Sequence, residues 1–584
     1  MFEKITLISD YGVNIKLHQG TDTTNLMNMH LVMEDNSRNI VIEVEYVDLD
    51  IIKCRFLGEI IDNRFCPGII KKPSVNSNIR LMTDEEIKMI IGIQKDDNFT
   101  FGISPFYNNQ RVYAKVNDLF SNHLTILGNT GSGKSFGTTA VIQSLFKNPN
   151  LFPYKSNFIL FDNNGEYISA FKELNKLNPN YNFRILTTNY QTNYEKLTIP
   201  AWLLSEDDLA LLLGATTGNQ ITLIERMIKL ARIFSLSDEM CGKYKNHLLA
   251  KAMLSIIYSN DLPTTKRNNI FALYNTCTTR EFNMEAVVPG AGYTRKFREC
   301  FNIDKQGIFT ESILITNYIS SFVDNSLDDF ETDKYNAYTL ADLEKALAFA
   351  LLSENWLNNE TTYGESINIK VKLHNLVISK NSQIFNYPVF TGLVEYINQI
   401  IVSNNKKYQI ININLEDIDD HFAKVLVKIL CRLINEYAKK TPQRGAVPFN
   451  LLVEEAHRYI KTGEDIDLLG YNIFDRISKE GRKFGVLLTL ISQRPVELSE
   501  TVMSQCANFL IFKTTHPRDI EYITRMVPYI TEEIIEKQKG LQPGYCLAFG
   551  QGFKVPLIIK VDLPNPVPTS ANVDLIDRWG SRRA

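Results

Sequence analysis

An eight-residue, glycine-rich segment constrains this chain more than any other feature of its sequence. It runs from Gly128 to Ser135, reads GNTGSGKS and matches the pattern G-x-x-x-x-G-K-[ST] in full. The apolar run Leu124–Leu127 before it is typical of a buried strand, and the stretch from Ser135 to Phe146 has a helical pattern. A glycine-rich turn between a strand and a helix points successive backbone N–H groups at one centre, which predicts a phosphate-binding P-loop. A chance glycine turn is the alternative, and the flanking strand and helix disfavour it.

The P-loop also predicts which ligands are bound. Lys134 is expected to reach the β- and γ-phosphates, and the Ser135 hydroxyl is expected to ligate Mg²⁺. The predicted cofactors are therefore ATP and Mg²⁺. All eight loop residues are predicted to contact the nucleotide, namely Gly128, Asn129, Thr130, Gly131, Ser132, Gly133, Lys134 and Ser135.

Two adjacent carboxylates follow another apolar strand. Leu451–Val453 leads directly into Glu454 and Glu455. When a P-loop enzyme hydrolyses its nucleotide, one acid can hold the water shell of Mg²⁺ while the next polarises the attacking water. We predict that Glu454 serves the metal and Glu455 the water. A solvated acidic strand end is the alternative.

A second acid competes with this pair. The apolar strand Phe158–Phe161 ends at Asp162, which offers a single carboxylate and is therefore a weaker candidate for the metal. We still predict that Asp162 faces the nucleotide. His457, beside the acid pair, is interpreted as a structural hydrogen-bonding residue because no cluster of metal ligands surrounds it.

Two further polar residues are candidates for catalysis. Gln493 follows an apolar strand, where it could sense the γ-phosphate or orient the water. Arg482 precedes that strand and could project outward to a neighbouring subunit, where an arginine stabilises the charge that develops during phosphoryl transfer. Arg476 is the substitute for that role, and an ordinary surface arginine is the alternative.

The first 95 residues read as short strands. In Ile40–Val47 the apolar side chains of Ile42, Val44 and Tyr46 alternate with Glu43 and Glu45, and Ile52–Phe56 alternates in the same way after a short turn. This pattern indicates a hairpin and favours a small barrel or sandwich. A β-rich edge of the following domain is the alternative.

The rest of the chain is predicted to be one α/β domain with a helical interruption. Apolar strands with helical patterns between them occur in 96–200 and again in 401–565. The segment 201–400 is mostly helical, and Ser205–Asp208 and Thr339–Asp342 have the pattern of capping boxes. The proline-rich segment 566–584 is expected to be a surface tail.

Composition restricts where the chain can work. There is no run of 18 apolar residues, which argues against a membrane span, and the eight cysteines are scattered singly, as expected for reduced thiols in the cytoplasm. The net charge of −3 means that a nucleic-acid partner would need a local basic surface.

With these motifs in place, the chain resembles the HerA ATPases of the HerA–FtsK superfamily. The resemblance covers most of the chain, is weakest between about 235 and 380, and rests on motifs that occur in the family's order. These motifs are Ser121–Leu127, Asp162–Tyr167, Ile199–Leu204, Glu454–His457, Glu480–Gly485 and Ser492–Pro495.

The resemblance implies an N-terminal β-barrel, a RecA-like core carrying a helical bundle, and a homohexameric ring that moves along double-stranded DNA by hydrolysing ATP. It favours Arg482 as the arginine supplied to a neighbour. Members act with nucleases, and bacterial relatives pair with a nuclease or with a sirtuin-like NAD⁺-consuming enzyme in anti-phage defence, so such a partner is expected here.

Two departures from the family pattern bear on turnover. Glu454 stands where the family usually has aspartate, and Asp162-Asn-Asn-Gly-Glu-Tyr167 lacks the family's histidine. Two other functions remain open on these residues. One is an ATP-controlled scaffold that assembles and activates the partner with little DNA movement, and the other is a small-molecule kinase, which the paired acids disfavour.

Overall fold

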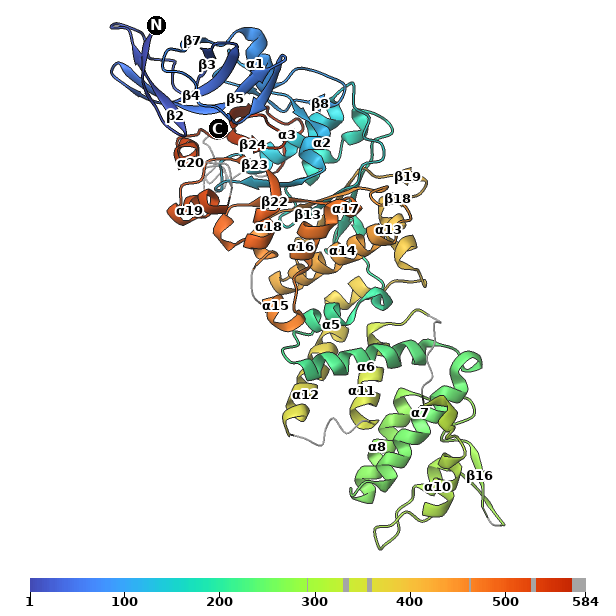
Figure 1. The fold of residues 1–584 in the computed structure, drawn as a ribbon. Coiled ribbons are helices and arrows are strands. Elements are labelled where there is room, and N and C mark those ends of the chain that lie inside the picture. The colour runs from blue at the N-terminus through green and yellow to red at the C-terminus, as the bar shows by residue number, and fades with distance from the viewer. Residues whose placement is uncertain (291, 329–335, 354–359, 462–463, 527–531, 570–584) are drawn as a thin grey trace, which may run out of the picture.

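The computed structural model describes the chain except for residues 291, 329–335, 354–359, 462–463, 527–531 and 570–584. Figure 1 shows an elongated molecule with a β-rich part at one end, a large sheet in the middle and a group of helices at the other end. None of the described helices is long and apolar enough to cross a membrane.

The large sheet is built mainly from parallel strands. Among the described residues it has 12 strands in the order β10-β9-β25-β24-β23-β12-β22-β21-β13-β20-β14-β15. The strands from β23 to β15 in this order are parallel, and β24, β25, β9 and β10 continue the sheet with antiparallel pairing. Their bounds are β9 Gly102–Ser104, β10 Gln110–Arg111, β12 His123–Leu127, β13 Phe158–Asp162, β14 Phe183–Thr187, β15 Glu195–Lys196, β20 Ile410–Asn414, β21 Phe449–Val453, β22 Val486–Ser492, β23 Cys506–Ile511, β24 Tyr545–Gly550 and β25 Leu557–Val561.

The central parallel strands are buried and mostly apolar because both faces of the sheet are covered. In β13, Phe158 and Leu160 pack into one hydrophobic cluster, while Ile159 and Phe161 pack into another on the opposite face. The helices α3 (Lys134–Lys147) and α14 (Asp420–Lys440) supply much of this cover. The predicted α/β P-loop fold is confirmed.

The N-terminal part is an antiparallel sheet with its own hydrophobic cluster. The pairing path is β1-β2-β5-β4-β3-β7, and β6 pairs with β5. The bounds are β1 Phe2–Ile8, β2 Gly12–Leu17, β3 His30–Asp35, β4 Arg38–Asp48, β5 Ile51–Ile61, β6 Arg64–Pro67 and β7 Asn78–Leu81.

The alternation predicted for the first hairpin is only partly correct. β4 and β5 pair as expected, but the register shifts between Val41 and Ile42 and again between Val44 and Tyr46. A bulge turns the side chains that follow it to the other face of a strand, and Tyr46, after the second shift, is 56% exposed. Glu43 precedes that shift and is buried, where it contacts Arg55 and Lys537.

Between β15 and β20 the chain leaves the sheet and forms a group of helices. Two small β-hairpins are described there, β16 (Val287–Pro289) with β17 (Thr294–Lys296), and β18 (Val402–Ser403) with β19 (Lys406–Lys407). Both predicted capping boxes are present, because Ser205 and Asp208, and likewise Thr339 and Asp342, exchange side-chain and backbone hydrogen bonds. The larger helices are α5 Glu206–Leu212, α6 Gly218–Ser235, α7 Asp238–Tyr258, α8 Pro263–Thr276, α10 Ser312–Ser320, α11 Leu340–Ser353, α12 Glu360–Ile378 and α13 Leu393–Ile401.

A buried ion pair fastens these helices to the sheet domain. Nε of Arg432 on α14 donates to Asp208 on α5 over 3.0 Å, and the Arg432 guanidinium also donates to the carbonyl of Leu203. The pair ties α5, at the start of the helical part, to α14 of the sheet domain.

Candidate nucleotide-binding site

The P-loop connects β12 to α3 in a conformation that needs its glycines. Gly131 and Gly133 have φ values of 76° and 101°, in the left-handed region that side chains disfavour. A Cβ atom on Gly133 would also lie 2.8 Å from the backbone nitrogen of Gly544. The loop therefore depends on these glycines for its shape, as the motif predicts.

Neighbouring segments hold the loop in place. The Asn129 N–H donates to the carbonyl of Lys513 over 2.9 Å, and the Gly544 N–H donates to the carbonyl of Ser132 over 3.1 Å. Within the loop, the Ser132 hydroxyl donates to the Asn129 carbonyl over 2.7 Å. The segments after β23 and before β24 thus brace the P-loop, which reduces the ordering that a bound phosphate must impose.

A cavity of about 530 Å³ opens over the P-loop, a size that suits a nucleotide. The P-loop and the start of α3 line it, together with Glu166, Glu454 and Glu455. The segment from Pro543 to Pro564 contributes a wall and a fourth acidic residue, Asp562. The sequence does not predict this wall, because nothing in the segment from Pro543 to Pro564 indicates that it lies against the P-loop.

Glu454 and Glu455 lie at the end of β21, as predicted, and both line the cavity. Glu454 is buried, and its Oε2 accepts from the Asn163 N–H over 3.2 Å. Burial and the nearby charge of Asp162 raise the pKa of Glu454 well above its ordinary value. Burial also raises the pKa of Glu455, and the ammonium of Lys134 opposes that shift.

Glu455 has a strained backbone. Its φ of 47° and ψ of 46° are left-handed, which is costly for a residue with a side chain. This conformation turns the chain sharply after β21. Glycine would adopt this conformation without strain. The glutamate side chain at position 455 therefore lowers the stability of the fold.

The structure places Asp162 differently from the prediction. Asp162 is fully buried and does not line the cavity. Its Oδ1 accepts from the Glu166 N–H over 3.1 Å, and its Oδ2 accepts from the Tyr167 N–H over 3.0 Å and from Asn412 Nδ2 over 2.8 Å. The carboxylate is turned back into its own loop, so it organises that loop instead of contacting the nucleotide.

Glu166 takes the place at the cavity that was predicted for Asp162. The Ser135 hydroxyl donates to Glu166 Oε2 over 2.9 Å. Glu166 was missed because it lies in a loop four residues beyond the strand end, whereas the prediction considered only acids directly after strands. The motif Asp162–Tyr167 contained it, and a left-handed Gly165 with φ of 68° marks the turn that brings it back.

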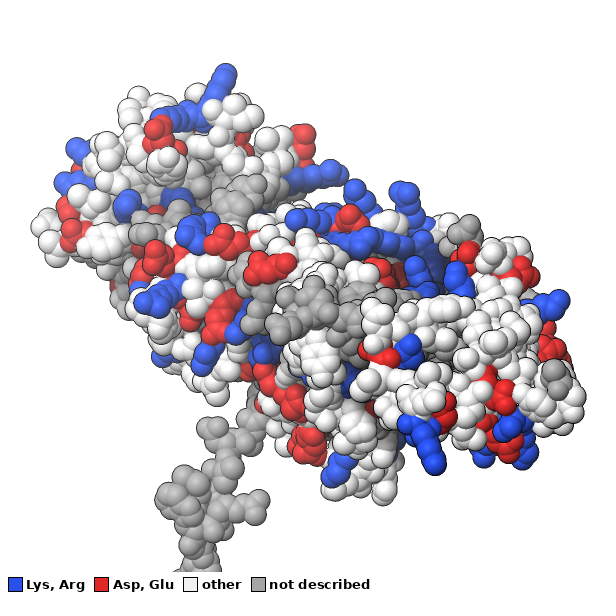
Figure 2. Space-filling model, turned by 90° about the horizontal axis from the view of Figure 1, so that it is seen from below, with Lys and Arg blue, Asp and Glu red and all other residues white. Residues whose placement is uncertain are grey.

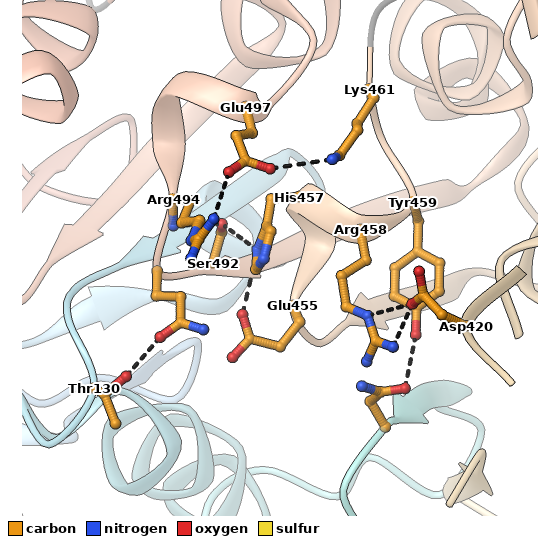
Figure 3. Close-up of polar contacts among 12 residues, drawn as sticks. Thr130, Asp420, Glu455, His457, Arg458, Tyr459, Lys461, Ser492, Arg494 and Glu497 are labelled. Atoms are coloured by element: carbon orange, nitrogen blue, oxygen red, sulfur yellow. Dashed lines mark hydrogen bonds and ion pairs between the residues drawn. The ribbon is translucent and has the colours of Figure 1, made fainter. Parts of the chain in front are cut away.

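Gln493 and His457 join the site from the neighbouring strands. The Thr130 hydroxyl of the P-loop donates to Gln493 Oε1 over 2.6 Å. His457 Nδ1 lies 3.3 Å from the Ser492 hydroxyl and 3.3 Å from Glu455 Oε2 (Figure 3). Burial lowers the pKa of His457 to about 4, so the ring is neutral near pH 7 and orders the strand ends without adding charge.

Arg482 and Arg476 lie outside the cavity of their own chain. Arg482 begins the short helix α17 (Arg482–Phe484) and is exposed. Arg476 ends α16 (Ile473–Arg476), where its guanidinium lies 5.8 Å from the centre of the Tyr471 ring.

A P-loop on a parallel sheet, with paired acids at the end of another strand, defines the class of P-loop ATPases. Residues 103–285 match the family model described as the central domain of helicase HerA. The chain is 24% identical over 552 residues to a probable DNA double-strand break repair helicase HerA of Methanocaldococcus jannaschii, covering 93% of this chain and 90% of the relative. It is 23% identical over 547 residues to the HerA helicase of Pyrococcus furiosus, covering 91% of this chain and 82% of the relative.

These matches show that the chain is similar to HerA helicases along most of its length. Among solved structures, VirB4 of Thermoanaerobacter pseudethanolicus matches 81% of this chain and 98% of that chain, with 15% identity and a TM-score of 0.41.

The strained backbone at Glu455 leads to a prediction about stability. We expect the Glu455→Gly variant to be more stable than Glu455→Ala by about 1 kcal/mol, because only glycine relieves the left-handed conformation. Thermal unfolding without nucleotide measures the difference. The same two changes at Glu225, which is exposed in the middle of helix α6, should give the opposite order. Equal stability of the two Glu455 variants would show that the backbone carries no strain there.

Proposed function

We propose that this protein binds ATP–Mg²⁺, hydrolyses it and uses the energy to move along double-stranded DNA as a homohexameric ring. One observation carries the ATPase part: Lys134, Ser135 and the two strand-end acids Glu454 and Glu455 face a single cavity. A phosphate-binding loop with acids beside it suits attack by water on the terminal phosphate.

The donor set fits magnesium bound together with a nucleotide. Ser135, Glu166, Glu454 and Glu455 offer oxygen atoms at the cavity, which is the ligand type that Mg²⁺ prefers. Among the described residues, no group of three His, Cys, Asp or Glu side chains is arranged to hold a metal alone. This suits an ion held partly by phosphates and water. When bound, Mg²⁺ would neutralise charge on the phosphates.

The residues divide the work as follows. Lys134 binds the phosphates, Glu454 holds the water shell of the metal, and Glu455 accepts a proton from the attacking water. Gln493 is held beside the P-loop by its hydrogen bond with Thr130, which suits a role in sensing the terminal phosphate.

The position of the arginines supports the proposed ring. Because Arg482 is exposed and outside the cavity of its own chain, it can stabilise charge only on a nucleotide bound by a neighbour. A head-to-tail contact of this kind must close into a ring or grow into a filament. We propose a hexamer with Arg482 as the trans-acting residue and Arg476 as its alternative.

DNA is proposed as the track because both full-length relatives are named DNA double-strand break repair helicases. Figure 2 shows Lys and Arg side chains gathered in a band on one face of a molecule whose net charge is only −3. A local basic surface of this kind can neutralise backbone phosphates although the whole chain is nearly neutral. Such contacts carry no base information, so binding should not depend on sequence.

The wider role rests on the family resemblance. We propose that the N-terminal sheet is a HerA-type barrel, that the helices of 201–400 are a bundle inserted into a RecA-like core, and that the ring works with a nuclease or a sirtuin-like NADase in anti-phage defence. The free cysteines of the described chain suit reduced thiols in the cytoplasm.

The first prediction from the proposed function separates nucleotide binding from hydrolysis. Lys134→Ala should lose ATP binding, because the phosphates lose their cation. Glu455→Gln should keep binding but hydrolyse ATP about 10²- to 10⁴-fold more slowly, because only the group that accepts the proton is gone. Calorimetric binding and steady-state phosphate release measure the two effects. Wild-type turnover by Glu455→Gln would refute the assigned role.

The second prediction concerns the ring. Light scattering should give a mass of about six times 66.9 kDa in the presence of nucleotide. Arg482→Ala should reduce turnover by about 1,000-fold or more. Mixing it with Lys134→Ala subunits should restore part of the activity, because the latter keep their arginine. A monomer at micromolar concentration, or a mixed ring without recovery, would contradict the proposal.

The third prediction distinguishes a motor from a scaffold. A motor should hydrolyse ATP faster on long duplex DNA than on short duplex DNA, since it soon leaves a short one. Binding should weaken steeply with salt. The measurement is the ATPase rate against duplex length at two salt concentrations, with and without a co-purifying partner. Equal rates at all lengths, with no DNA binding at low salt, would favour the scaffold.

A further inference from the structure

We propose that Glu166 is a further acidic residue of the magnesium site, where it holds the water shell of the ion beside Ser135. We also propose that Asp162 is the positioning residue that fixes Glu166 there. This inference rests on the proposed function, because it assumes that ATP–Mg²⁺ occupies the cavity over the P-loop.

The position of Glu166 is the first step. Its Oε2 accepts a hydrogen bond from the Ser135 hydroxyl over 2.9 Å, and Ser135 is the P-loop residue expected to bind the metal. Glu166 lines the same cavity as Glu454 and Glu455. A carboxylate that already contacts the hydroxyl ligand lies within reach of the water shell of an ion bound to that hydroxyl.

The loop that carries Glu166 is fixed from both sides. Asp162 accepts from the backbone N–H groups of Glu166 and Tyr167, and the Tyr167 side chain is fully buried. The carbonyl of Glu166 accepts from the N–H of Thr569 over 2.8 Å. Because the backbone is held before and after the side chain, Glu166 is pre-organised at the cavity and does not need to be ordered by the ligand.

Glu454 already accepts a hydrogen bond within the protein, which is a reason to expect a second acid at the metal. Glu454 is buried, and one of its carboxylate oxygens is occupied by the Asn163 N–H, in the same loop as Glu166. A strand-end acid held in this way has fewer oxygens to offer to metal-bound water. Glu166 supplies carboxylate oxygens next to Ser135, and so complements Glu454.

The test compares nucleotide affinity with and without magnesium. Calorimetry on the full chain, titrated with a non-hydrolysable ATP analogue in Mg²⁺ and then in EDTA, gives the gain in affinity that magnesium provides. Glu166→Gln should bind the analogue in EDTA as the wild type does, while the gain from Mg²⁺ falls about 10- to 100-fold. Asp162→Asn should show a smaller loss of the same kind, since the amide can accept only one of the two loop hydrogen bonds.

Glu173→Gln is the matched control, because Glu173 is exposed and pairs with Lys176 outside the cavity. It should keep the full magnesium gain. Thermal unfolding without nucleotide checks the fold of each variant, and Glu166→Asp, which keeps the charge, should recover part of the gain.

Two results would overturn the inference. One is an unchanged magnesium gain in Glu166→Gln, and the other is an equal loss of affinity in Mg²⁺ and in EDTA, which would make Glu166 a purely structural residue. Failure of the wild type to bind the analogue at all would instead remove the proposed function itself, so the two failures can be told apart.

Discussion

The shared direction of the parallel strands is the constraint on which the nucleotide site depends. Because β12 lies between β22 and β23, the P-loop leaves the sheet beside the strand that carries Ser492 and Gln493. The strand β21 follows on the far side of β22, and β13 follows β21. Parallel strands end at the same edge, so residues more than 300 positions apart converge without any long loop having to carry them there.

The same alignment concentrates negative charge. The ends of β13 and β21 bring Asp162, Glu166, Glu454 and Glu455 close together, and the pKa values of both strand-end glutamates rise as a result of burial and mutual repulsion. Lys134 is the cation that opposes this effect for Glu455. A site with raised carboxyl pKa values favours the arrival of a cation, which stabilises the charged forms of the acids.

The sequence was informative where function depends on neighbours in the chain. The P-loop, its flanking strand and helix, and the acid pair at Glu454 are local patterns, and each could be predicted. The buried position of Asp162 and the contact of Glu166 with Ser135 could not, because they depend on how a loop turns after its strand. The burial of Glu43 against Lys537, which is distant in the sequence, likewise leaves no mark in the local pattern. The wall from Pro543 to Pro564 depends on tertiary contacts alone.

The contacts of residues 565–569 affect when the nucleotide site can form during synthesis. Residues 565–569 form hydrogen bonds with Gln143 of α3, with Ser169 and with Glu166, and the cavity wall lies just before them. A ribosome adds about 5 to 20 residues each second, so the P-loop emerges long before this segment exists. The nucleotide site can therefore be completed only after this segment has been made. A nascent chain that stops before Pro543 lacks one wall of the cavity.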